Sequence, residues 1–548
     1  MAIDQAFDWI CVGSGTSGLA AAVFGHDRGL KTLVLEKAAK IGGTTAQGGG
    51  LLYVPMNHLM AVAGIADSRD EALEYLQFLG GPYYSPDHQN AFVDNVSRAI
   101  AYLANKAGVR FRISEMIDFW ARRSERGWRH DDRDVGSKRQ GRSLICEPFP
   151  AALLGEWRDK VRLDDFYHGF AEVLEGQEHD PSLARLTTGA ALGPSIGHSG
   201  PIRGKDTLAL RLWRERLGSD VERLLAKDEE HRVAGAALVC YLMRALLDRG
   251  VDVRLNASVR ELVTEKGRVV GLTVRVDGKD QHIRARKGVL LATGGGNGWR
   301  LAAGAGADIR SSPNLPALPA FSVPEEDGLS RANYEPRMRH SLIVNRFGER
   351  FGDEVPYQGL MVGWLKFDAH GEHRWVNIPN YLIFDRQALE KYSFAGRPPG
   401  ATEGLDWLAQ GHTIAELARN MNIPPEKLTA TLERFNENAG KGEDPDFHRI
   451  PETLGKLEKP PFYGVQCDPP DFDPMAASMS AVVDCNGQML DHETHQPIPG
   501  LYGAYSGATK SEIRKMVFGY GYTAGLGQAT SITFDLLSAE HAAASEAS

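Results

Sequence analysis

The chain has 548 residues, which is more than one hydrophobic core can organise and indicates two or three domains. Hydrophobic residues make up 42% of it, yet no run approaches the ~20 consecutive apolar residues of a membrane span. The formal net charge of -9 argues against nucleic acid or an anionic membrane as a partner.

The five cysteines are odd in number and scattered, and no two of them form a CxxC pair. Such usage is typical of unpaired thiols in a reducing compartment, and it provides neither a zinc site nor an iron–sulfur cluster. We therefore expect no bound metal. The N-terminus lacks a basic start followed by an apolar core, so we expect no secretory signal and a cytoplasmic location.

The first 37 residues have the pattern of a dinucleotide-binding βαβ unit. An apolar run over residues 7–12 predicts a buried first strand, an Ala-rich segment to about Arg28 predicts a helix, and "KTLVLE" predicts the second strand. The glycines of a GxGxxG motif follow the first strand directly, and they are Gly13, Gly15 and Gly18.

Each part of this unit has a role in holding a pyrophosphate. Gly13 permits the tight turn, Gly15 lets the backbone approach the phosphates, and Gly18 lets the helix pack on the strand. The helix N-terminus faces the phosphate charge. Glu36 ends the second strand, where an acid accepts a hydrogen bond from a ribose hydroxyl. The sequence therefore predicts an adenine dinucleotide site here.

A second glycine-rich stretch, "IGGTTAQGGG", follows over residues 41–50. Hydroxyl side chains among glycines beside a phosphate site suit a backbone wrapped closely around an extended ligand. From about residue 60 to 125 the pattern is mainly helical, with "DEALEYLQFLG" and "NAFVDNVSRAIAYLANKAG" as its clearest segments.

A third piece of the same kind of domain lies far along the chain. The stretch from Gly235 predicts a helix, a strand, and a hairpin that turns at "EKGR", and "GVLLATGGG" predicts a strand that runs into glycines. The proline-rich "SSPNLPALPAFSVPEEDG" indicates the crossing into a second domain. We expect "KPPFYGVQC" to lead back and the stretch from Asp484 to Gly507 to complete the first domain with strands.

These motifs together resemble the FAD-dependent fumarate reductase and 3-ketosteroid dehydrogenase superfamily. The resemblance rests on "GSGTSGLAAA", "VLEK", "IGGTTAQGGG", "GRVVGL" and "LLATGGG" and covers nearly the whole chain. It implies an α/β protein in which a discontinuous Rossmann-like FAD-binding domain carries an inserted α+β catalytic domain. We expect the FAD-binding domain over 1–310 and 462–548 and the catalytic domain over 311–461.

The resemblance also assigns an FAD site. It implies that Glu36 holds the adenosine ribose, that the backbone of Val259 meets the adenine edge, and that residues 44–46 line the flavin. The helix that starts near Ala524 would point its positive end at the flavin pyrimidine, where negative charge develops on reduction. The full set comprises Gly13, Gly15, Thr16, Ser17, Gly18, Glu36, Lys37, Gly43, Thr44, Thr45, Ala46, Gly48, Gly49, Gly50, Val259, Thr293, Gly294, Tyr505, Ser506, Ala524 and Leu526.

The superfamily divides by what faces the flavin. Fumarate reductases hold a dicarboxylate with arginines and histidine, whereas the ketosteroid branch uses tyrosines around an apolar cleft. The segment "GERFGDEVPY" resembles the branch's segment that ends in a catalytic tyrosine, and Tyr357 takes that place. The branch's second tyrosine aligns with Phe119 and Trp120, so that hydroxyl is replaced by an aromatic wall.

The C-terminal stretch "KMVFGYGYTAGLGQATSITFDLL" resembles the end of the ketosteroid enzymes. There a tyrosine and a backbone N–H bind the ketone oxygen. Here Tyr520 or Tyr522 would be that tyrosine, and the N–H would come from Thr523 or Ala524. Two tyrosines in a glycine-rich turn also suit plain aromatic packing.

Three functions follow from these patterns. The first is FAD-dependent desaturation next to the carbonyl of a cyclic ketone, either a 3-ketosteroid or a smaller ring such as cyclohexanone. The alternative is a fumarate-reductase-type enoate reductase that acts on an unsaturated acid. Arg514 would favour an oxo-acid substrate or this fumarate-type reaction if it held a carboxylate, although its segment also suits a surface turn. The third is a redox subunit without its own substrate. With no second dinucleotide site evident, we expect a quinone or a carrier as electron acceptor and a small apolar ketone as substrate.

Overall fold

The structure, a computed structural model, describes most of the chain. The described residues are 5–46, 48–114, 118, 135–138, 140–162, 231–232, 234–276, 278–294, 298–312, 320–325, 328–333, 338–354, 360, 363–364, 366–392, 394, 400, 402–449, 451–467, 478–503, 516–517, 523 and 525–546. Internal contacts divide them into two compact units. The first contains the described residues up to 162, those from 231 to 312 and those from 478 on, and the second contains those from 320 to 467.

A large sheet organises the first unit, in the order β22-β23-β11-β1-β2-β8. Five of its strands are parallel neighbours: β1 (Gln5–Val12), β2 (Thr32–Leu35), β8 (Asp252–Arg254), β11 (Lys279–Leu291) and β23 (Pro497–Tyr502). The edge strand β22 (Gln488–Leu490) is antiparallel to β23. Parallel strands end at one edge, so the loops after β1, β2 and β11 lie together there.

The long strand β11 belongs to two pairings. Its first half continues the antiparallel pair β9 (Ser258–Glu265) and β10 (Arg268–Val276), and its second half lies along β1, where Val289 pairs with Ile10. The chain turns between β9 and β10 at Lys266 and Gly267, both with positive φ. This is the hairpin that "EKGR" predicts.

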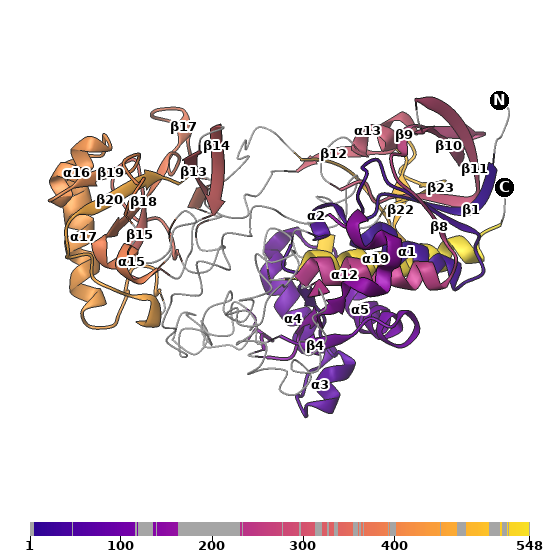
Figure 1. The fold of residues 1–548 in the computed structure, drawn as a ribbon, viewed down its shortest axis with the longest axis horizontal. Coiled ribbons are helices and arrows are strands. Elements are labelled where there is room, and N and C mark those ends of the chain that lie inside the picture. Colours follow the sequence, from indigo (N-terminus) through magenta and orange to yellow (C-terminus); the bar gives the residue numbers. More distant parts are fainter. Residues whose placement is uncertain are drawn as a thin grey trace. The chain divides into compact units, whose positions relative to one another are not determined.

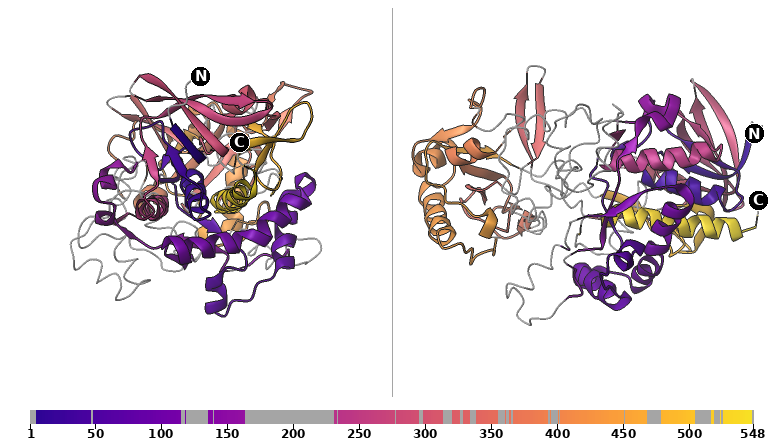
Figure 2. Two further views of the ribbon diagram at one scale, coloured as in Figure 1. Left: turned by 90° about the vertical axis from the view of Figure 1, so that its right-hand side faces the viewer. Right: turned by 60° about the horizontal axis from the view of Figure 1, so that its bottom comes forward.

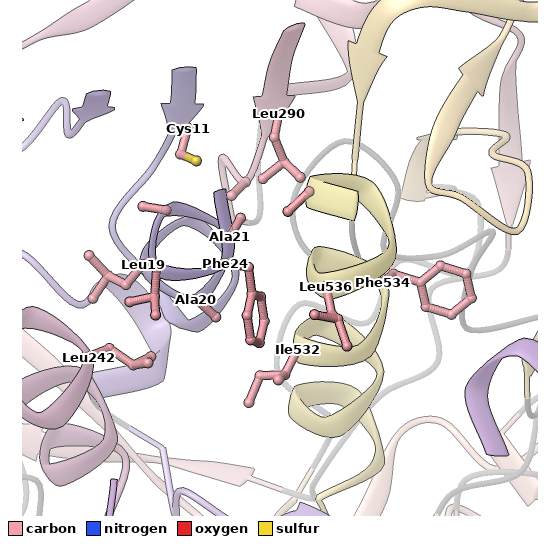
Figure 3. Packing of buried hydrophobic residues seen from close by; sticks show 14 of the residues in the cluster. Cys11, Leu19, Ala20, Ala21, Phe24, Leu242, Leu290, Ile532, Phe534 and Leu536 are labelled. Carbon is pink, nitrogen blue, oxygen red and sulfur yellow. The ribbon is translucent and has the colours of Figure 1, made fainter. Parts of the chain in front are cut away.

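Three helices cover one face of the sheet: α1 (Thr16–His26), α12 (Ala234–Asp248) and α19 (Leu526–Ala544). In Figure 2 (left) α1 lies between the other two, and both neighbours contact it. Each residue from Thr16 to Gly25 is buried, because α1 is apolar all round and has the sheet above it and a helix on either side. Figure 3 shows Phe24 of α1 facing Ile532 of α19.

The remaining elements of the first unit frame this layer (Figure 1). A small sheet has the order β3-β5-β4, and α5 packs on α19. The bounds are α2 (Gly43–Ala46), β3 (Leu52–Tyr53), α3 (His58–Val62), α4 (Arg69–Gly80), α5 (Pro86–Ala107), β4 (Phe111–Ile113), β5 (Ser143–Cys146), β6 (Phe149–Pro150), β7 (His231–Arg232), α13 (Gly298–Gly304), β12 (Ile309–Ser312) and β21 (Ser478–Ala481), with 3₁₀ helices at Gly81–Tyr83 and Ala151–Lys160.

The second unit is built on a four-stranded antiparallel sheet in the order β15-β18-β20-β19. Buried residues of two helices, such as Leu417 and Leu428, join residues of the sheet in one core. The bounds are β13 (Ala320–Glu325), β14 (Gly328–Asn333), β15 (Ser341–Asn345), β16 (Phe367–Asp368), β17 (Arg374–Trp375), β18 (Asn380–Asp385), α15 (Arg386–Lys391), β19 (Ala409–Gly411), α16 (Ile414–Asn420), α17 (Pro425–Ala439) and β20 (Phe462–Gln466), with a 3₁₀ helix at Pro451–Thr453.

The structure confirms the predicted fold class and differs in one detail. The sequence places residues from 462 on in the first domain, but β20 lies inside the sheet of the second unit, paired with both β18 and β19. Its apolar residues satisfy either location, so the sequence pattern alone does not choose between them. The pairing partners decide it.

All five cysteines are unpaired, as expected, and four of them are buried. Among the described helices, none combines the length and the apolar character that crossing a membrane requires.

Candidate cofactor site

The turn from β1 into α1 is closed so tightly that side chains have no room. Gly13 has φ +113°, and a Cβ there would lie 2.2 Å from the carbonyl oxygen of Ala292. A Cβ on Gly18 would lie 1.8 Å from the carbonyl oxygen of Gly13. The first and third glycines therefore let the end of β1, the end of β11 and the first turn of α1 meet backbone to backbone, as the motif predicts.

Threonine side chains organise the N-terminus of α1. Gly15 is the N-cap residue and offers no side-chain cap. The Oγ1 of Thr45, on α2, instead accepts a hydrogen bond from the backbone N–H of Thr16 at 3.0 Å. The Thr16 hydroxyl lies 3.0 Å from the same oxygen and 3.3 Å from Oε1 of Gln528 on α19. Three predicted site segments thus converge at the positive end of a helix, which suits a pyrophosphate.

The Ser17 hydroxyl points away from this end. It donates to Oδ1 of Asp535 on α19 at 2.6 Å, and both side chains are buried. Burial raises the pKa of Asp535 well above its ordinary value. The serine side chain therefore joins α1 to α19.

Glu36 stands buried where β2 ends. Its carboxylate accepts hydrogen bonds from the backbone N–H of Ser14 at 3.0 Å, the Ser14 hydroxyl at 2.6 Å and the N–H of Ala38 at 2.8 Å. A carboxylate has about four acceptor positions, so room remains for a ribose hydroxyl. Ser14 was not among the predicted site residues, and the feature that could have indicated it is its small hydroxyl side chain inside the GxGxxG motif. Its Oγ also accepts from the N–H of Gly42 and so ties the two glycine-rich stretches together.

The end of β11 carries an unsatisfied polar group. Thr293 Oγ1 is buried and has no hydrogen-bond partner among the described residues. Gly294 follows with φ +67°, and a Cβ there would meet nothing within 4 Å. An unpaired hydroxyl beside open space at the end of a parallel strand is an arrangement that a polar ligand would complete.

Val259 lies near Glu36, the acidic residue at the end of β2. The N–H of Ala257 donates to the carbonyl oxygen of Glu36 at 2.8 Å, and β9 begins at the next residue. Val259 is half-buried and pairs with Val274. The two residues assigned to the adenosine end therefore lie on adjoining segments. Lys37 is exposed beside them.

In the second glycine-rich stretch, residues 41–50, Gly43 leaves open space whereas Gly50 packs against the start of α12. Gly43 has positive φ and open space around its Cβ position, and Thr44 follows it on α2. Gly50 instead serves packing, because a Cβ there would lie 2.4 Å from the backbone of Ala234 at the start of α12. Gly48 accepts a hydrogen bond from Gly235 through its carbonyl oxygen. Ala46 is buried in the core, and Gly49 lies between Gly48 and Gly50 in the described backbone.

The turn before α19 is anchored to the first unit. Thr523 is buried, and the hydroxyl of Tyr75 donates to its Oγ1 at 3.4 Å. Gly525 has φ +83°, and a Cβ there would lie 2.6 Å from the N of Leu52 on β3. The helix begins at Leu526, close to its expected start near Ala524. Eight other predicted site residues lie outside the described residues: Phe119, Trp120, Tyr357, Tyr505, Ser506, Tyr520, Tyr522 and Ala524.

A buried charge network that the sequence did not reveal includes Tyr53 of β3. Arg142, 1% exposed, donates to Asp67 at 2.6 Å, to Asp118 at 3.1 Å and to the hydroxyl of Tyr53 at 3.1 Å. Burial raises the pKa of Asp118 to about 6, and the charge of Arg142 opposes that rise. Asp118 directly precedes Phe119, so the network fixes the chain at the start of a predicted active-site segment.

Comparison with known proteins decides the family. The sequence matches the family described as "FAD binding domain" over residues 8–318 and 296–509. The chain belongs to this family. It is an FAD-dependent oxidoreductase of the fumarate reductase and succinate dehydrogenase flavoprotein superfamily, and its cofactor is FAD. The glycine turn and the unpaired Thr293 hydroxyl fit that dinucleotide.

Relatives within this FAD-binding family cover nearly the whole chain. A 3-oxosteroid 1-dehydrogenase of Mycobacterium tuberculosis is 28% identical over 98% of both chains. A 4-oxocyclohexanecarboxylate 2-dehydrogenase of Sinomonas cyclohexanicum is 27% identical, over 95% of this chain and 90% of its own. The solved structure of a 3-ketosteroid delta1-dehydrogenase from Sterolibacterium denitrificans, in complex with 1,4-androstadiene-3,17-dione, is 25% identical, with a TM-score of 0.76 over 99% of this chain and 100% of its own. The resemblance to the ketosteroid branch is confirmed.

Replacing Gly18 by Ala tests the close approach of the first turn of α1 to the carbonyl oxygen of Gly13. The new Cβ must push the turn away from Gly13, and overpacking of this kind costs about 1–3 kcal/mol, so the FAD dissociation constant should rise about 5- to 150-fold. Loss of the flavin's visible absorption during dialysis measures this. Gly304→Ala, where a Cβ meets open space, is the matched control and should keep FAD. Equal FAD retention in both variants would contradict the assignment of the turn.

Replacing Asp118 by Asn tests the buried network. The folded-state pKa of about 6 lies above the ordinary 3.8, so the unfolded chain releases this proton first as pH rises. The contribution of Asp118 to stability therefore falls by about 3 kcal/mol between about pH 4 and pH 6 and is level above that range. The amide in the variant cannot ionise, so the Tm of the variant relative to the parent protein should rise from pH 4 to pH 7. A Tm difference that is independent of pH would refute the raised pKa.

Proposed function

We propose that this protein is an FAD-dependent dehydrogenase that introduces a carbon–carbon double bond next to the carbonyl of a cyclic ketone. One observation carries the proposal. Relatives named for dehydrogenation of ring ketones match the chain nearly end to end, through both the FAD-binding unit and the second unit that contains Tyr357 in its sequence. A redox subunit without its own substrate would not need that second unit.

The reaction requires a polarised carbonyl, removal of an acidic α-proton and departure of a hydride from the β-carbon. FAD, when bound, supplies the acceptor for the hydride. The family resemblance assigns the ketone oxygen to the hydroxyl of Tyr520 or Tyr522 and to the N–H of Thr523 or Ala524. Such donors stabilise a developing enolate, and one of them is typically worth about 10²–10³ in rate.

Tyr357 is the proposed base. A phenol has an unperturbed pKa near 10, so it needs a hydrogen-bond donor or positive potential to act as tyrosinate. In the ketosteroid branch a second tyrosine takes this helping role. Here Phe119 and Trp120 occupy the aligned positions, so another group must help.

The same replacement bears on the substrate. The sequence has Phe119 and Trp120 where the ketosteroid branch carries its second tyrosine, and we propose that the substrate is a ring smaller than a steroid, such as a cyclohexanone. The relative named for 4-oxocyclohexanecarboxylate supports this choice. Arg514 is the side chain that would hold a carboxylate on such a ring. For the electrons we propose a quinone or carrier acceptor.

A substrate panel with a dye acceptor tests the function. The FAD-loaded protein should reduce the dye with cyclohexanones, with or without a 4-carboxylate, faster than with 3-ketosteroids. Fumarate and other enoates, offered with reduced dye, should not be reduced. Turnover of an enoate and not of any cyclic ketone would show that the enoate reductase is the correct function, and the dye absorbance reports both directions.

Replacing Tyr357 by Phe tests the base. Loss of a general base typically lowers turnover by about 10²–10⁴-fold, while the FAD content should not change because the FAD-binding residues lie elsewhere in the chain. Tyr83→Phe, at a tyrosine that is 53% exposed, is the matched control and should keep full activity. Retained dehydrogenation in the Tyr357 variant would rule out this residue as base.

A further inference from the structure

A short chain of polar side chains joins the first turns of α1 and α19. The Oγ1 of Thr45 on α2 accepts a hydrogen bond from the backbone N–H of Thr16, and it lies 3.0 Å from the Thr16 hydroxyl. That hydroxyl lies 3.3 Å from Oε1 of Gln528, on the first turn of α19. The amide of Gln528 therefore lies beside the N-terminus of α1, although the two residues are far apart in the sequence.

A count of hydrogens shows how these contacts are made together. A hydroxyl has one hydrogen, so the Thr16 hydroxyl does not donate to Thr45 and to Gln528 at once. Both contacts form when the Thr45 hydroxyl donates to Thr16 and the Thr16 hydroxyl donates to Oε1 of Gln528. The other end of the amide, Nε2 with its two N–H groups, lies 4.0 Å from the place where a Cβ on Gly48 would be. The amide nitrogen thus lies among α1, α19 and the second glycine-rich stretch.

The surroundings of this amide call for neutral donors. The GxGxxG turn over residues 13–18, the stretch over residues 41–50 and α19 contain no lysine and no arginine. FAD is the cofactor of the family, and a GxGxxG turn places its pyrophosphate at the N-terminus of the helix that follows. From these three segments the phosphate oxygens can be met only by N–H and O–H groups. Gln528 is half-buried and carries two such N–H groups.

We infer that Gln528 is an FAD ligand whose amide nitrogen donates to the pyrophosphate, so that α19 holds this group together with α1. The inference depends on FAD binding and not on the ketone reaction. Thr16 and Thr45 are positioning residues, because they hold the amide oxygen and leave the N–H groups for the phosphates. Loss of a hydrogen bond to a charged group typically weakens binding by about 10- to 150-fold.

Two substitutions in the full chain distinguish a ligand from a structural link. Gln528→Glu keeps an oxygen that accepts from Thr16 and replaces the N–H groups by negative charge, whereas Gln528→Met removes both ends of the amide at similar length. The FAD dissociation constant should rise about 10- to 150-fold in Gln528→Met and further in Gln528→Glu, because the carboxylate repels the phosphates. The change in flavin fluorescence on binding measures it. Gln77→Glu, exposed on α4, is the control with the same charge change and should bind FAD like the parent protein.

Tighter FAD binding by Gln528→Glu than by Gln528→Met would show that only the link to Thr16 matters, and it would overturn the inference. ADP carries the pyrophosphate without the flavin, so its affinity as a competitor of FAD should fall by the same factor as that of FAD. The midpoint potential of the flavin should not change, because oxidised and reduced FAD carry the same pyrophosphate. An unchanged ADP affinity together with a lowered potential would place the donor on the flavin ring and also overturn the inference.

A third variant keeps the test decisive if Gln528→Glu does not fold. Gln528→Lys loses the acceptor for Thr16 but keeps N–H donors and adds a positive charge. A pyrophosphate ligand at this position predicts that Gln528→Lys binds FAD more tightly than Gln528→Met. The reverse order of affinities would contradict the inference.

Discussion

The structure depends on a backbone contact in which the turn after β1 touches the end of β11 and the start of α1 at once. Gly13 and Gly18 make this contact possible, since any side chain at either position would overlap a carbonyl oxygen. The consequence is that the N-terminus of α1 opens at the edge where β1, β2 and β11 all end. A helix dipole, an acid on β2 and an unpaired hydroxyl after β11 are thereby brought to one place, and that combination suits a dinucleotide.

Hydroxyl groups then lock the surrounding segments onto this turn. Ser14 joins Glu36 to Gly42, and Thr45 joins α2 to α1. Ser17 joins α1 to α19 through Asp535. These bonds connect parts of the chain that lie far apart in the sequence, so the FAD site is assembled only when the whole first unit has folded.

Two buried charge networks adjoin the segments that the family resemblance makes catalytic. In the first unit Arg142 holds Asp118, the neighbour of Phe119. In the second unit Arg350 and Arg449 hold Glu354, which precedes Tyr357 by three residues in the sequence. A buried ion pair adds little net stability compared with apolar packing, but breaking one partner away is costly. Such networks therefore fix geometry more than they increase stability.

Much of the FAD-binding unit could be predicted from the sequence, because its signals are local: the GxGxxG turn, the acid after β2, and the hairpin at Lys266 and Gly267. The place of β20 could not, since an apolar strand does not specify its partners. Gly50 shows the same limit in another form. The absence of a side chain at Gly50 lets the backbone at the start of α12 approach. This contact joins residues far apart in the chain, so a glycine-rich stretch of sequence does not reveal it. Arg142, Arg350 and Arg449 were also missed, because an isolated arginine in a sequence is typical of the surface and only the fold shows its burial.

Anaerobic mixing of the FAD-loaded protein with a saturated cyclic ketone is the sharpest test of ketone desaturation, because it needs no knowledge of the natural electron acceptor. We expect the visible absorbance of the oxidised flavin to disappear as the ketone becomes an enone. An oxidised flavin that no cyclic ketone reduces, together with a chemically reduced flavin that an unsaturated acid reoxidises, would contradict it.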